Sequence, residues 1–253
     1  MPTSRRLRAV ITNDDGIESP GLWALATAAR EAGFEVTVAA PHVDTSGAGG
    51  SVLAVRDDDG HVRVHRRDRD GITGYAVEGH PAFIALSVAR GWLDAPDVLL
   101  SGINLGQNTG RAILHSGTVG AALAAGLQGI RALAVSQGIG WPPNPNPRWD
   151  SSTSLLPGVL DTLLAAPEGT VLSLNVPDLP VDELGPLREA ELAPAGTVQV
   201  RVTEGEGRLR TEYLGSGQEP GPESDVALLA AGHPTVTSLT SVEAITGLLA
   251  GST

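Results

Sequence analysis

The chain has 253 residues and a formal net charge of −12, and its 41% hydrophobic and 18% charged residues are typical of a globular protein rather than a disordered one. It contains no cysteine, which excludes disulfides, thiolate catalysis and cysteine-based metal sites. All 17 basic residues are arginine, so the chain lacks the lysine that a P-loop, a Schiff-base enzyme or a haloacid-dehalogenase-type phosphatase normally uses.

Charge and hydropathy also limit the partners and the compartment. An acidic chain argues against nonspecific binding to nucleic acid, which relies on basic residues to displace counterions. No apolar run approaches the roughly 18 residues of a membrane span. The apolar stretch near the N-terminus stops at Asn13 and is too short for a signal peptide. We therefore expect a cytoplasmic protein that binds neither membranes nor nucleic acid. A small anionic substrate would then need a local positive charge, for which a metal ion is the obvious source.

The start of the chain predicts a βαβ unit. Residues 8–12 are apolar and β-prone and lead into a polar turn, which indicates a buried strand. A helix is predicted from Pro20, with Ser19 as its cap, to Gly33, and residues 36–40 form a second predicted strand. Such a unit makes the two strands parallel, with a right-handed crossover.

The middle of the chain continues the alternation of strands and helices. A Gly- and Ser-rich loop over residues 42–51 precedes alternating segments around a turn at 57–60, which predict a hairpin. The next predicted elements are a helix over 81–93, a buried strand over 98–100, a polar loop over 101–110, a helix over 116–126 and a strand over 132–136. We expect the parallel core to end at that last strand.

The C-terminal part is less regular. Its predicted elements are a proline-rich loop at 141–147, a helix over 154–166, a strand over 171–175 and a hairpin arm over 197–213. The arm has little core of its own and needs another subunit or the main body to pack against. The fold class is therefore α/β. We expect a Rossmann-like parallel sheet between helices, with residues 1–140 as the catalytic core and 141–253 completing the fold.

Polar side chains gather in the loops after three predicted strands, and in a doubly wound sheet ligands bind at the carboxyl ends of the strands. The three loops supply Asn13, Asp14 and Asp15; Thr45, Ser46 and Ser51; and Ser101, Asn104 and Asn108. Two adjacent carboxylates repel each other in a cleft unless a cation lies between them, and Mg²⁺ or Mn²⁺ favours these oxygen ligands. An isolated Asp-Asp-Gly is more often a turn, so the metal prediction depends on the surrounding motifs.

Further features of these loops indicate an anion site. Glycines let backbone N–H groups turn towards a phosphate, and the predicted helix at residue 116 begins with hydroxyls at its positive dipole end. Tight turns and an ordinary N-cap at Ser116 explain the same features when each is taken alone.

Four strings of the sequence, in this order and at this spacing, resemble the motifs of the SurE family. They are Thr12–Ile17, Ala40–Pro41 followed by Ser46–Gly47, Ser101–Asn108, and His115–Gly120. The resemblance covers residues 8–136 well and is weaker at Asn175–Pro177 and Ser224–Val226. It implies a Rossmann-like phosphatase that hydrolyses nucleoside monophosphates. It also implies a homodimer or homotetramer with exchanged C-terminal elements, which suits the hairpin arm.

The resemblance further implies one divalent cation per subunit, Mg²⁺ or Mn²⁺. Its ligands would be Asp14, Asp15, Ser46 and Asn104, and the catalytic residues would be Asp14, Asp15 and Asn104. The residues expected to position the phosphate are Asn13, Gly47, Asn108, Ser116, Gly117 and Thr118. Some positions depart from the family pattern on the base and sugar side, which puts the identity of the substrate in doubt. These positions are Val43, Asp44, Thr45, Gly50 and Phe83.

Several alternatives stay open from the sequence. The nucleophile is either a water activated by the metal or one of the aspartates. His42 and His115 lie nearest the predicted site, but lone loop histidines are more often structural, and no role is assigned to them. The main alternative function is a nucleotide-binding regulator without turnover. A dinucleotide-dependent oxidoreductase would need a G-x-G-x-x-G turn, and the serine-hydrolase elbow at 134–138 lacks its first glycine.

Overall fold

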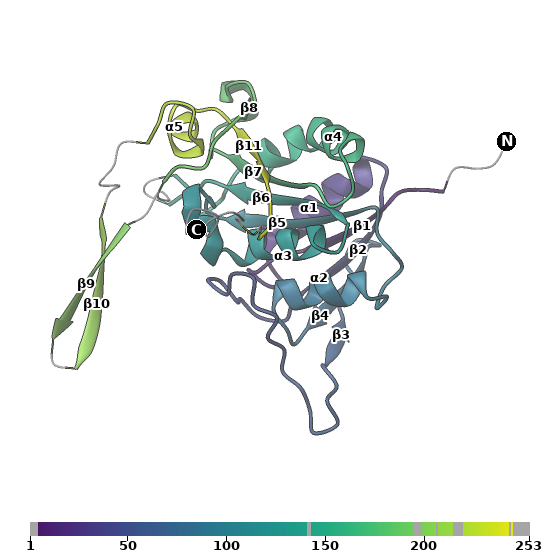
Figure 1. Ribbon diagram of the computed structural model, residues 1–253. Helices are drawn as coiled ribbons and strands as arrows, with labels where there is room; N and C mark the ends of the chain where they lie inside the picture. Colours follow the sequence, from purple (N-terminus) through teal and green to yellow (C-terminus); the bar gives the residue numbers. More distant parts are fainter. Residues whose placement is uncertain are drawn as a thin grey trace, which may run out of the picture.

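The computed structural model describes residues 5–140, 143–194, 199–205, 207–214, 220–242 and 244 (Figure 1). Its strands are β1 Arg8–Thr12, β2 Glu35–Pro41, β3 Val64–Arg66, β4 Thr73–Val77, β5 Val98–Leu105, β6 Arg131–Gln137, β7 Val171–Val176, β8 Arg188–Glu189, β9 Gln199–Gly205, β10 Arg208–Leu214 and β11 Thr235–Leu239. Its helices are α1 Pro20–Glu31, α2 Pro81–Ala89, α3 Gly117–Gly126, α4 Trp149–Ala165 and α5 Asp225–Ala230, with 3₁₀ turns at Gly110–His115 and Val181–Glu183.

One nine-stranded sheet forms the centre of the molecule, in the order β3-β4-β2-β1-β5-β6-β7-β11-β8. The neighbours from β4 to β7 are all parallel, whereas β3 runs antiparallel to β4 and β11 runs antiparallel to β7. The predicted α/β fold with a parallel, Rossmann-like sheet is confirmed. Because β1 lies between β2 and β5, the loops that follow these three strands leave the same edge of the sheet side by side.

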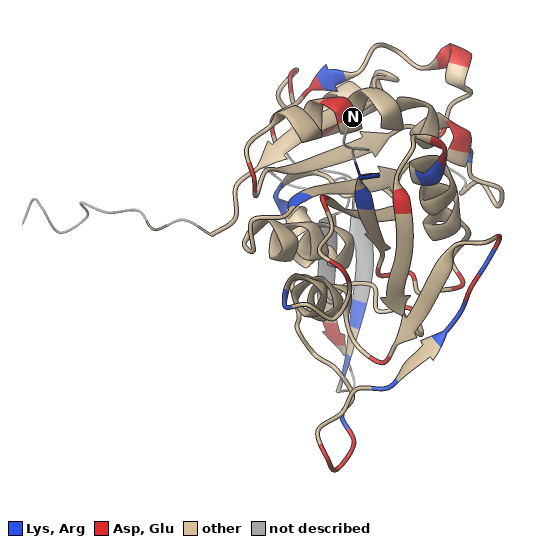
Figure 2. Ribbon diagram, turned by 90° about the vertical axis from the view of Figure 1, so that its right-hand side faces the viewer, with Lys and Arg blue, Asp and Glu red and all other residues tan. Residues whose placement is uncertain are grey.

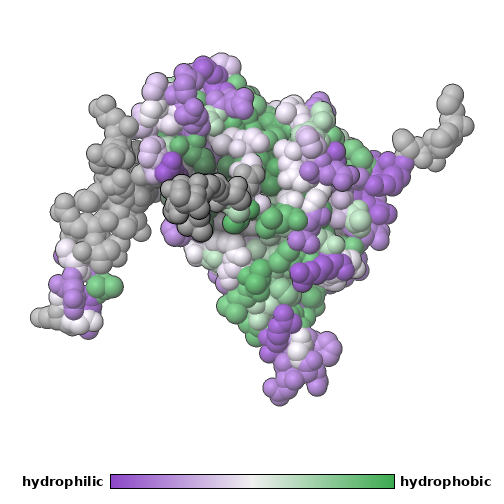
Figure 3. Space-filling view, in the orientation of Figure 1, coloured by the Kyte–Doolittle hydropathy of each residue, from purple (hydrophilic) through white to green (hydrophobic). Residues whose placement is uncertain are grey.

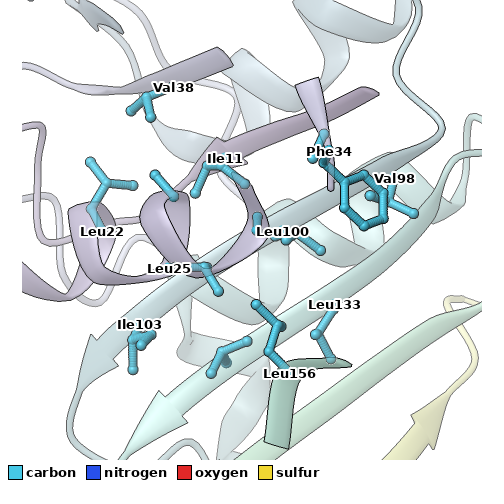
Figure 4. Packing of buried hydrophobic residues seen from close by; sticks show 14 of the residues in the cluster. Ile11, Leu22, Leu25, Phe34, Val38, Val98, Leu100, Ile103, Leu133 and Leu156 are labelled. Atoms are coloured by element: carbon cyan, nitrogen blue, oxygen red, sulfur yellow. The ribbon is translucent and has the colours of Figure 1, made fainter. Parts of the chain in front are cut away.

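Helices cover both faces of the sheet (Figure 1). On one face α1 and α4 contribute Leu22, Leu25 and Leu156, which pack on Ile11 and Leu100 (Figure 4). On the other face α2 and α3 pack on the alternate strand residues, among them Val10, Ala39 and Leu99. Each fully buried leucine or isoleucine contributes about 1.5–3 kcal/mol of transfer free energy. Because helices cover both faces of the sheet, its central strands are apolar at successive positions rather than at alternate ones.

The N-terminal elements agree closely with the sequence predictions, and four later ones differ. The helix predicted over 154–166 begins five residues earlier, as α4 at Trp149. The strand predicted at 98–100 runs on to Leu105, with a register shift between Ser101 and Asn104, so half of the predicted loop is strand. The helix predicted over 81–93 ends at Ala89. The parallel part of the sheet does not end at the strand over 132–136, because β7 adds a further parallel strand.

A separate two-stranded hairpin, β9 and β10, stands away from the main body (Figure 1). Its register pairs Gln199 with Leu214 and Gly205 with Arg208, which confirms the predicted C-terminal hairpin. Residues 197, 198 and 206 of the predicted arm lie outside the described residues. Among the described residues, no helix combines the length and the apolar character that crossing a membrane requires. Acidic and basic residues both occur in many segments along the ribbon (Figure 2).

Candidate functional site

The first loop of the site begins where β1 ends. Asn13 and Asp14 are buried, and Asp15 is partly exposed. The Asn13 side-chain amide donates to the Gly16 carbonyl (3.1 Å) and thereby holds the turn. Its carbonyl oxygen, Oδ1, is buried and has no hydrogen-bond partner among the described residues. A buried acceptor without a partner is costly in a folded protein, so this atom is a candidate contact for a ligand.

Asp14 and Asn104 converge on the hydroxyl of Thr118. Thr118 Oγ1 donates to Asp14 Oδ1 and lies 3.1 Å from Asn104 Oδ1, while the Asn104 amide nitrogen donates to the Gly106 carbonyl (2.8 Å). A hydroxyl has one proton, so Thr118 satisfies only one of these two acceptors at a time. The arrangement therefore presents acceptor oxygens from β1, β5 and α3 that call for a further positive partner.

Gly117 brings the start of α3 against Asp14. A Cβ atom built on Gly117 would lie 2.7 Å from Asp14 Oδ2 and 2.8 Å from Asp14 Cβ, which no real side chain tolerates. Ser116 is the N-cap of α3, and its Oγ accepts from the Val119 N–H (3.1 Å). The Asp14 carboxylate thus lies at the positive end of the α3 dipole.

The electrostatics around the two aspartates are unfavourable for negative charge. Burial raises the pKa of Asp14, and hydrogen bonds from Thr118 oppose this rise only in part. Burial, followed by the charge of Asp14, raises the pKa of Asp15 to about 7, although the Leu105 N–H donates to Asp15 Oδ2 (3.3 Å). The two carboxylates therefore need a neutralising partner to be fully ionised at neutral pH.

The second loop, after β2, is attached directly to the first. The Thr45 N–H donates to the Asp14 carbonyl (2.8 Å), and the neighbouring Ser46 donates from its N–H (2.8 Å) and its hydroxyl (2.6 Å) to Asp44 Oδ1. Because the Ser46 hydroxyl proton points at Asp44, the Oγ lone pairs face elsewhere. Gly47 has a φ of +82° and open space above it, so its backbone is accessible to an anion.

Asp44 is a part of the site that the sequence analysis noted only as a departure from the family pattern. Its charge raises the pKa of both Asp14 and Asp15, so a third carboxylate contributes to the local field. An Asp followed two residues later by Ser is typical of a side chain that accepts from the backbone at that spacing. This signal was present in the sequence.

Asn108 is also brought to this edge, but its groups already have partners. Its side-chain amide donates to Ser136 Oγ (2.9 Å), and its backbone N–H donates to Asn175 Oδ1 (2.9 Å). The Asn175 amide donates back to the Asn108 carbonyl (2.8 Å). Asp225 is fully buried and accepts from the Gly110 N–H (2.6 Å). These hydrogen bonds hold the loop after β5 in place. The two weaker family signatures, which contain Asn175 and Asp225, therefore have a structural role in fixing this loop.

The donor set fits a hard divalent cation. Within the described ranges no group of three or more His, Asp or Glu side chains could hold a metal, so carboxylates alone do not complete a site. The four expected ligands add one hydroxyl and one amide oxygen to two carboxylates, which is a ligand set that Mg²⁺ and Mn²⁺ accept. The unpartnered Asn13 oxygen and the raised pKa values of Asp14 and Asp15 both favour a positively charged partner at this point.

We assign no chemical role to either loop histidine. His42 Nδ1 lies 3.3 Å from the Val77 carbonyl, an arrangement in which the ring holds the chain after β2. His115 is exposed at the end of the 3₁₀ turn before α3.

Comparisons with known proteins agree with this geometry. The family described as Survival protein SurE matches residues 9–199. A 5'-nucleotidase SurE of Methylocella silvestris is 33% identical over 241 residues, covering 92% of this chain and 93% of the relative. One from Methanopyrus kandleri is 42% identical over 182 residues, covering 68% and 67%. The crystal structure of the SurE protein from Aquifex aeolicus superposes with a TM-score of 0.75 at 26% identity, covering 92% of each chain.

Proposed function

Because the chain belongs to the SurE family, we propose that it is a metal-dependent phosphomonoesterase that releases phosphate from nucleoside monophosphates. The relatives named 5'-nucleotidase support a nucleotide as the substrate. The observation that carries the proposal is the convergence of Asp14 Oδ1 and Asn104 Oδ1 on the single hydroxyl of Thr118. A binding protein without turnover would not need a second carboxylate, that of Asp15, directly beside this pair.

Asp14, Asp15, Ser46 and Asn104 are the residues we assign to the cation. A bound Mg²⁺ or Mn²⁺ supplies positive charge that makes an attacking water more acidic and neutralises the phosphate as its ester bond breaks. Asp44 holds the Ser46 hydroxyl proton, and Gly106 holds the Asn104 amide, so both ligand oxygens are oriented in advance. Pre-oriented groups lose little entropy when the substrate binds.

The start of α3 is the part of the chain that we assign to the phosphate group. The first N–H groups of a helix have no partner within the helix, and Ser116 Oγ takes only that of Val119. We assign the N–H group of Gly117, at the positive end of the dipole, to a phosphate oxygen, because the Thr118 N–H already donates to the Asp14 carboxylate. Asn13 Oδ1 is an acceptor, and it suits the cation or a water better than an anion. Gly47, with its open left-handed backbone, is a further donor for the phosphate.

The test is Asp14→Asn, assayed for phosphate release from a nucleoside monophosphate with added Mg²⁺ or Mn²⁺. We expect kcat/KM to fall at least about 100-fold, which corresponds to about 2.7 kcal/mol of barrier. The matched control is Asp161→Asn, an exposed carboxylate on α4. Activity of Asp14→Asn near that of the control would contradict the assignment. Nucleotide binding without phosphate release by the unaltered chain, with either metal, would favour the regulator instead.

A further inference from the structure

A small apolar cavity lies at the same edge of the sheet as the candidate site. It has a volume of about 150 Å³ and lies where β2 and β4 end. Its lining is mostly apolar and consists of His42, Val43, Thr45, Leu53, Ala54, Val55, Glu78, Gly79 and His80. The cavity borders the candidate site, since Thr45 both lines it and donates to the Asp14 carbonyl, and Ser46 follows directly.

The walls of the cavity are built by the fold. The Val55 N–H donates to the Glu78 carbonyl (2.8 Å), and the His80 N–H donates to the Leu53 carbonyl (2.9 Å), so the segment 53–55 is held against the end of β4. Gly79 packs tightly here, because a Cβ on it would lie 2.7 Å from the Phe83 ring. The cavity is therefore a preformed feature, as binding sites for small molecules usually are.

Apolar side chains face solvent around this cavity. Val43, Leu53 and Val55 line it, and each is more than half exposed, at 53%, 63% and 61%. Figure 3 shows apolar surface on the side of the body where α2 begins. Single exposed apolar residues are ordinary, but three around one cavity beside a candidate active site indicate a surface that a ligand covers.

One of the lining residues, His80, has a polar side-chain atom without a partner among the described residues. His80 occupies the N-cap position of α2 but makes no capping hydrogen bond, and its Nδ1 is buried with no partner among the described residues. Two other polar groups of the lining do have partners: His42 Nδ1 lies 3.3 Å from the Val77 carbonyl, and Glu78 Oε1 lies 3.5 Å from His65 Nε2. A buried ring nitrogen without a partner suits a ligand that brings a donor or an acceptor.

We propose that this cavity receives the nucleobase of the substrate, with Val43, Leu53 and Val55 against the ring faces and His80 Nδ1 at its polar edge. The inference rests on the proposed function. A ribose would have to bury hydroxyls against carbon, which is costly, whereas a flat heterocycle has apolar faces and a polar rim. The volume, about 150 Å³, is below the roughly 300–1,000 Å³ of sites that enclose a drug-sized ligand, so the cavity takes the base alone and leaves the sugar and phosphate over the adjoining site.

The experiment compares adenosine 5'-monophosphate with ribose 5-phosphate, which share the ribose and the phosphate and differ by the base. We expect the unaltered enzyme to prefer the nucleotide and Leu53→Ser to lower the ratio of the two kcat/KM values about tenfold. His80→Leu, which keeps an apolar side chain and removes the ring nitrogen, should lower the same ratio. The control is Leu127→Ser, a leucine of similar exposure (60%) that follows α3 at the opposite edge of the sheet, and it should leave the ratio unchanged.

A binding measurement separates this inference from the proposed function. Adenosine, which has no phosphate, should bind the unaltered protein in calorimetric titration and bind Leu53→Ser at least about fivefold more weakly. Phosphate release from neither substrate would refute the proposed function, and the adenosine titration would still test the cavity. Equal ratios in Leu53→Ser and Leu127→Ser would overturn the inference. So would a change of oligomeric mass in Leu53→Ser with unchanged adenosine binding, because the apolar surface would then be covered by a second copy.

Discussion

At the scale of single residues, the two aspartates of the first loop differ in how they are held. Asp14 is buried and accepts a hydrogen bond from Thr118. Asp15 is partly exposed, and its donor in the described part of the chain is the Leu105 N–H, at 3.3 Å. Burial and the Asp14 charge raise the pKa of Asp15 to about 7. Without a cation, Asp15 therefore keeps its proton in the folded protein at pH values where the unfolded chain has lost it.

This difference predicts how stability depends on pH in the metal-free protein. The folded pKa lies above the unfolded value of 3.8, so folding takes up a proton between about pH 4 and pH 7. Asp15 should therefore lower the free energy of unfolding as the pH rises through that window, by at most about 1.4 kcal/mol per pH unit. Asp15→Asn should reduce this slope by the contribution of Asp15, whereas Asp14, whose pKa is also raised by burial, keeps its own contribution. The measurement is urea denaturation in chelator at several pH values, with Asp161→Asn as the control.

The metal gives the matching test. Mn²⁺ needs ionised carboxylates, so the stabilisation it adds should increase with pH over the same window in the unaltered protein and be small in Asp15→Asn. Identical slopes for the unaltered protein and Asp15→Asn in chelator would contradict the assignment.

The residue types of the candidate site were selected from the sequence because polar side chains follow three predicted strands and occur in the motif order of a known family. Their partners were not. The hydrogen bonds of Asn108 to Ser136 and Asn175 join positions 28 and 67 residues away, a distance that no local pattern encodes. Asp44 was named from the sequence only as a departure from the family pattern. Its two hydrogen bonds from Ser46 are local, and they could have been predicted as those of an ordinary turn.

At the scale of elements, the start of α3 is constrained by its contact with the end of β1. Gly117→Ala would place a methyl group 2.7 Å from Asp14 Oδ2, so either the helix or the carboxylate must move. We expect an overpacking loss of about 1–3 kcal/mol in the free energy of unfolding and a large loss of phosphatase activity. Chemical denaturation and the phosphate assay measure the two effects.

Gly158→Ala is the control for that substitution. Gly158 lies inside α4 with nothing within 4 Å of its would-be Cβ, so alanine should stabilise the helix by about 0.5–1 kcal/mol and leave activity unchanged. If Gly117→Ala were as stable and as active as Gly158→Ala, the close contact with Asp14 would be of no consequence.

Helices and strands that are marked by local sequence patterns were predicted well. Strands whose extent depends on pairing with a neighbouring strand were not. β1 and α1 have apolar periodicity and a Pro20 start, and their predicted bounds agree with the structure to within about two residues. β5 continues through Ser101 to Leu105 because it pairs with the neighbouring strand β6 there, although the sequence is polar and contains glycine. β4 joins β2 in the main sheet, whereas alternation alone indicated only a hairpin.

At the scale of the whole molecule, the β9–β10 hairpin is the feature that most clearly needs a partner. Two strands alone are marginally stable, and this pair stands away from the body (Figure 1). We propose, as the family resemblance implies, that it mediates assembly into a homodimer or homotetramer. Replacing residues 199–214 with a short Gly-Ser linker should lower the mass measured by light scattering and leave the thermal unfolding of the body within a few degrees. An unchanged mass would contradict this role.

The order of strands was the least predictable property of the whole molecule. Alternating helices and strands indicate a parallel sheet, but they do not say which strand lies next to which. In the sheet, β11 lies between β7 and β8, although more than 50 residues separate it from β7 in the sequence. This position is set by backbone pairing between distant strands, which no local sequence pattern predicts.

The bond between Thr118 and Asp14 spans 104 residues of chain, and this separation has a consequence for biosynthesis. No nascent chain shorter than about 120 residues contains both groups, and the ribosome hides a further stretch of the newest residues. The proposed cation ligand Asn104 also lies far along the chain from Asp14, so binding of that cation would not assist the earliest collapse of β1, α1 and β2. Thr118 can hold the Asp14 carboxylate only after α3 has docked. Metal supply should accordingly affect how long the finished enzyme survives more than how fast it is made.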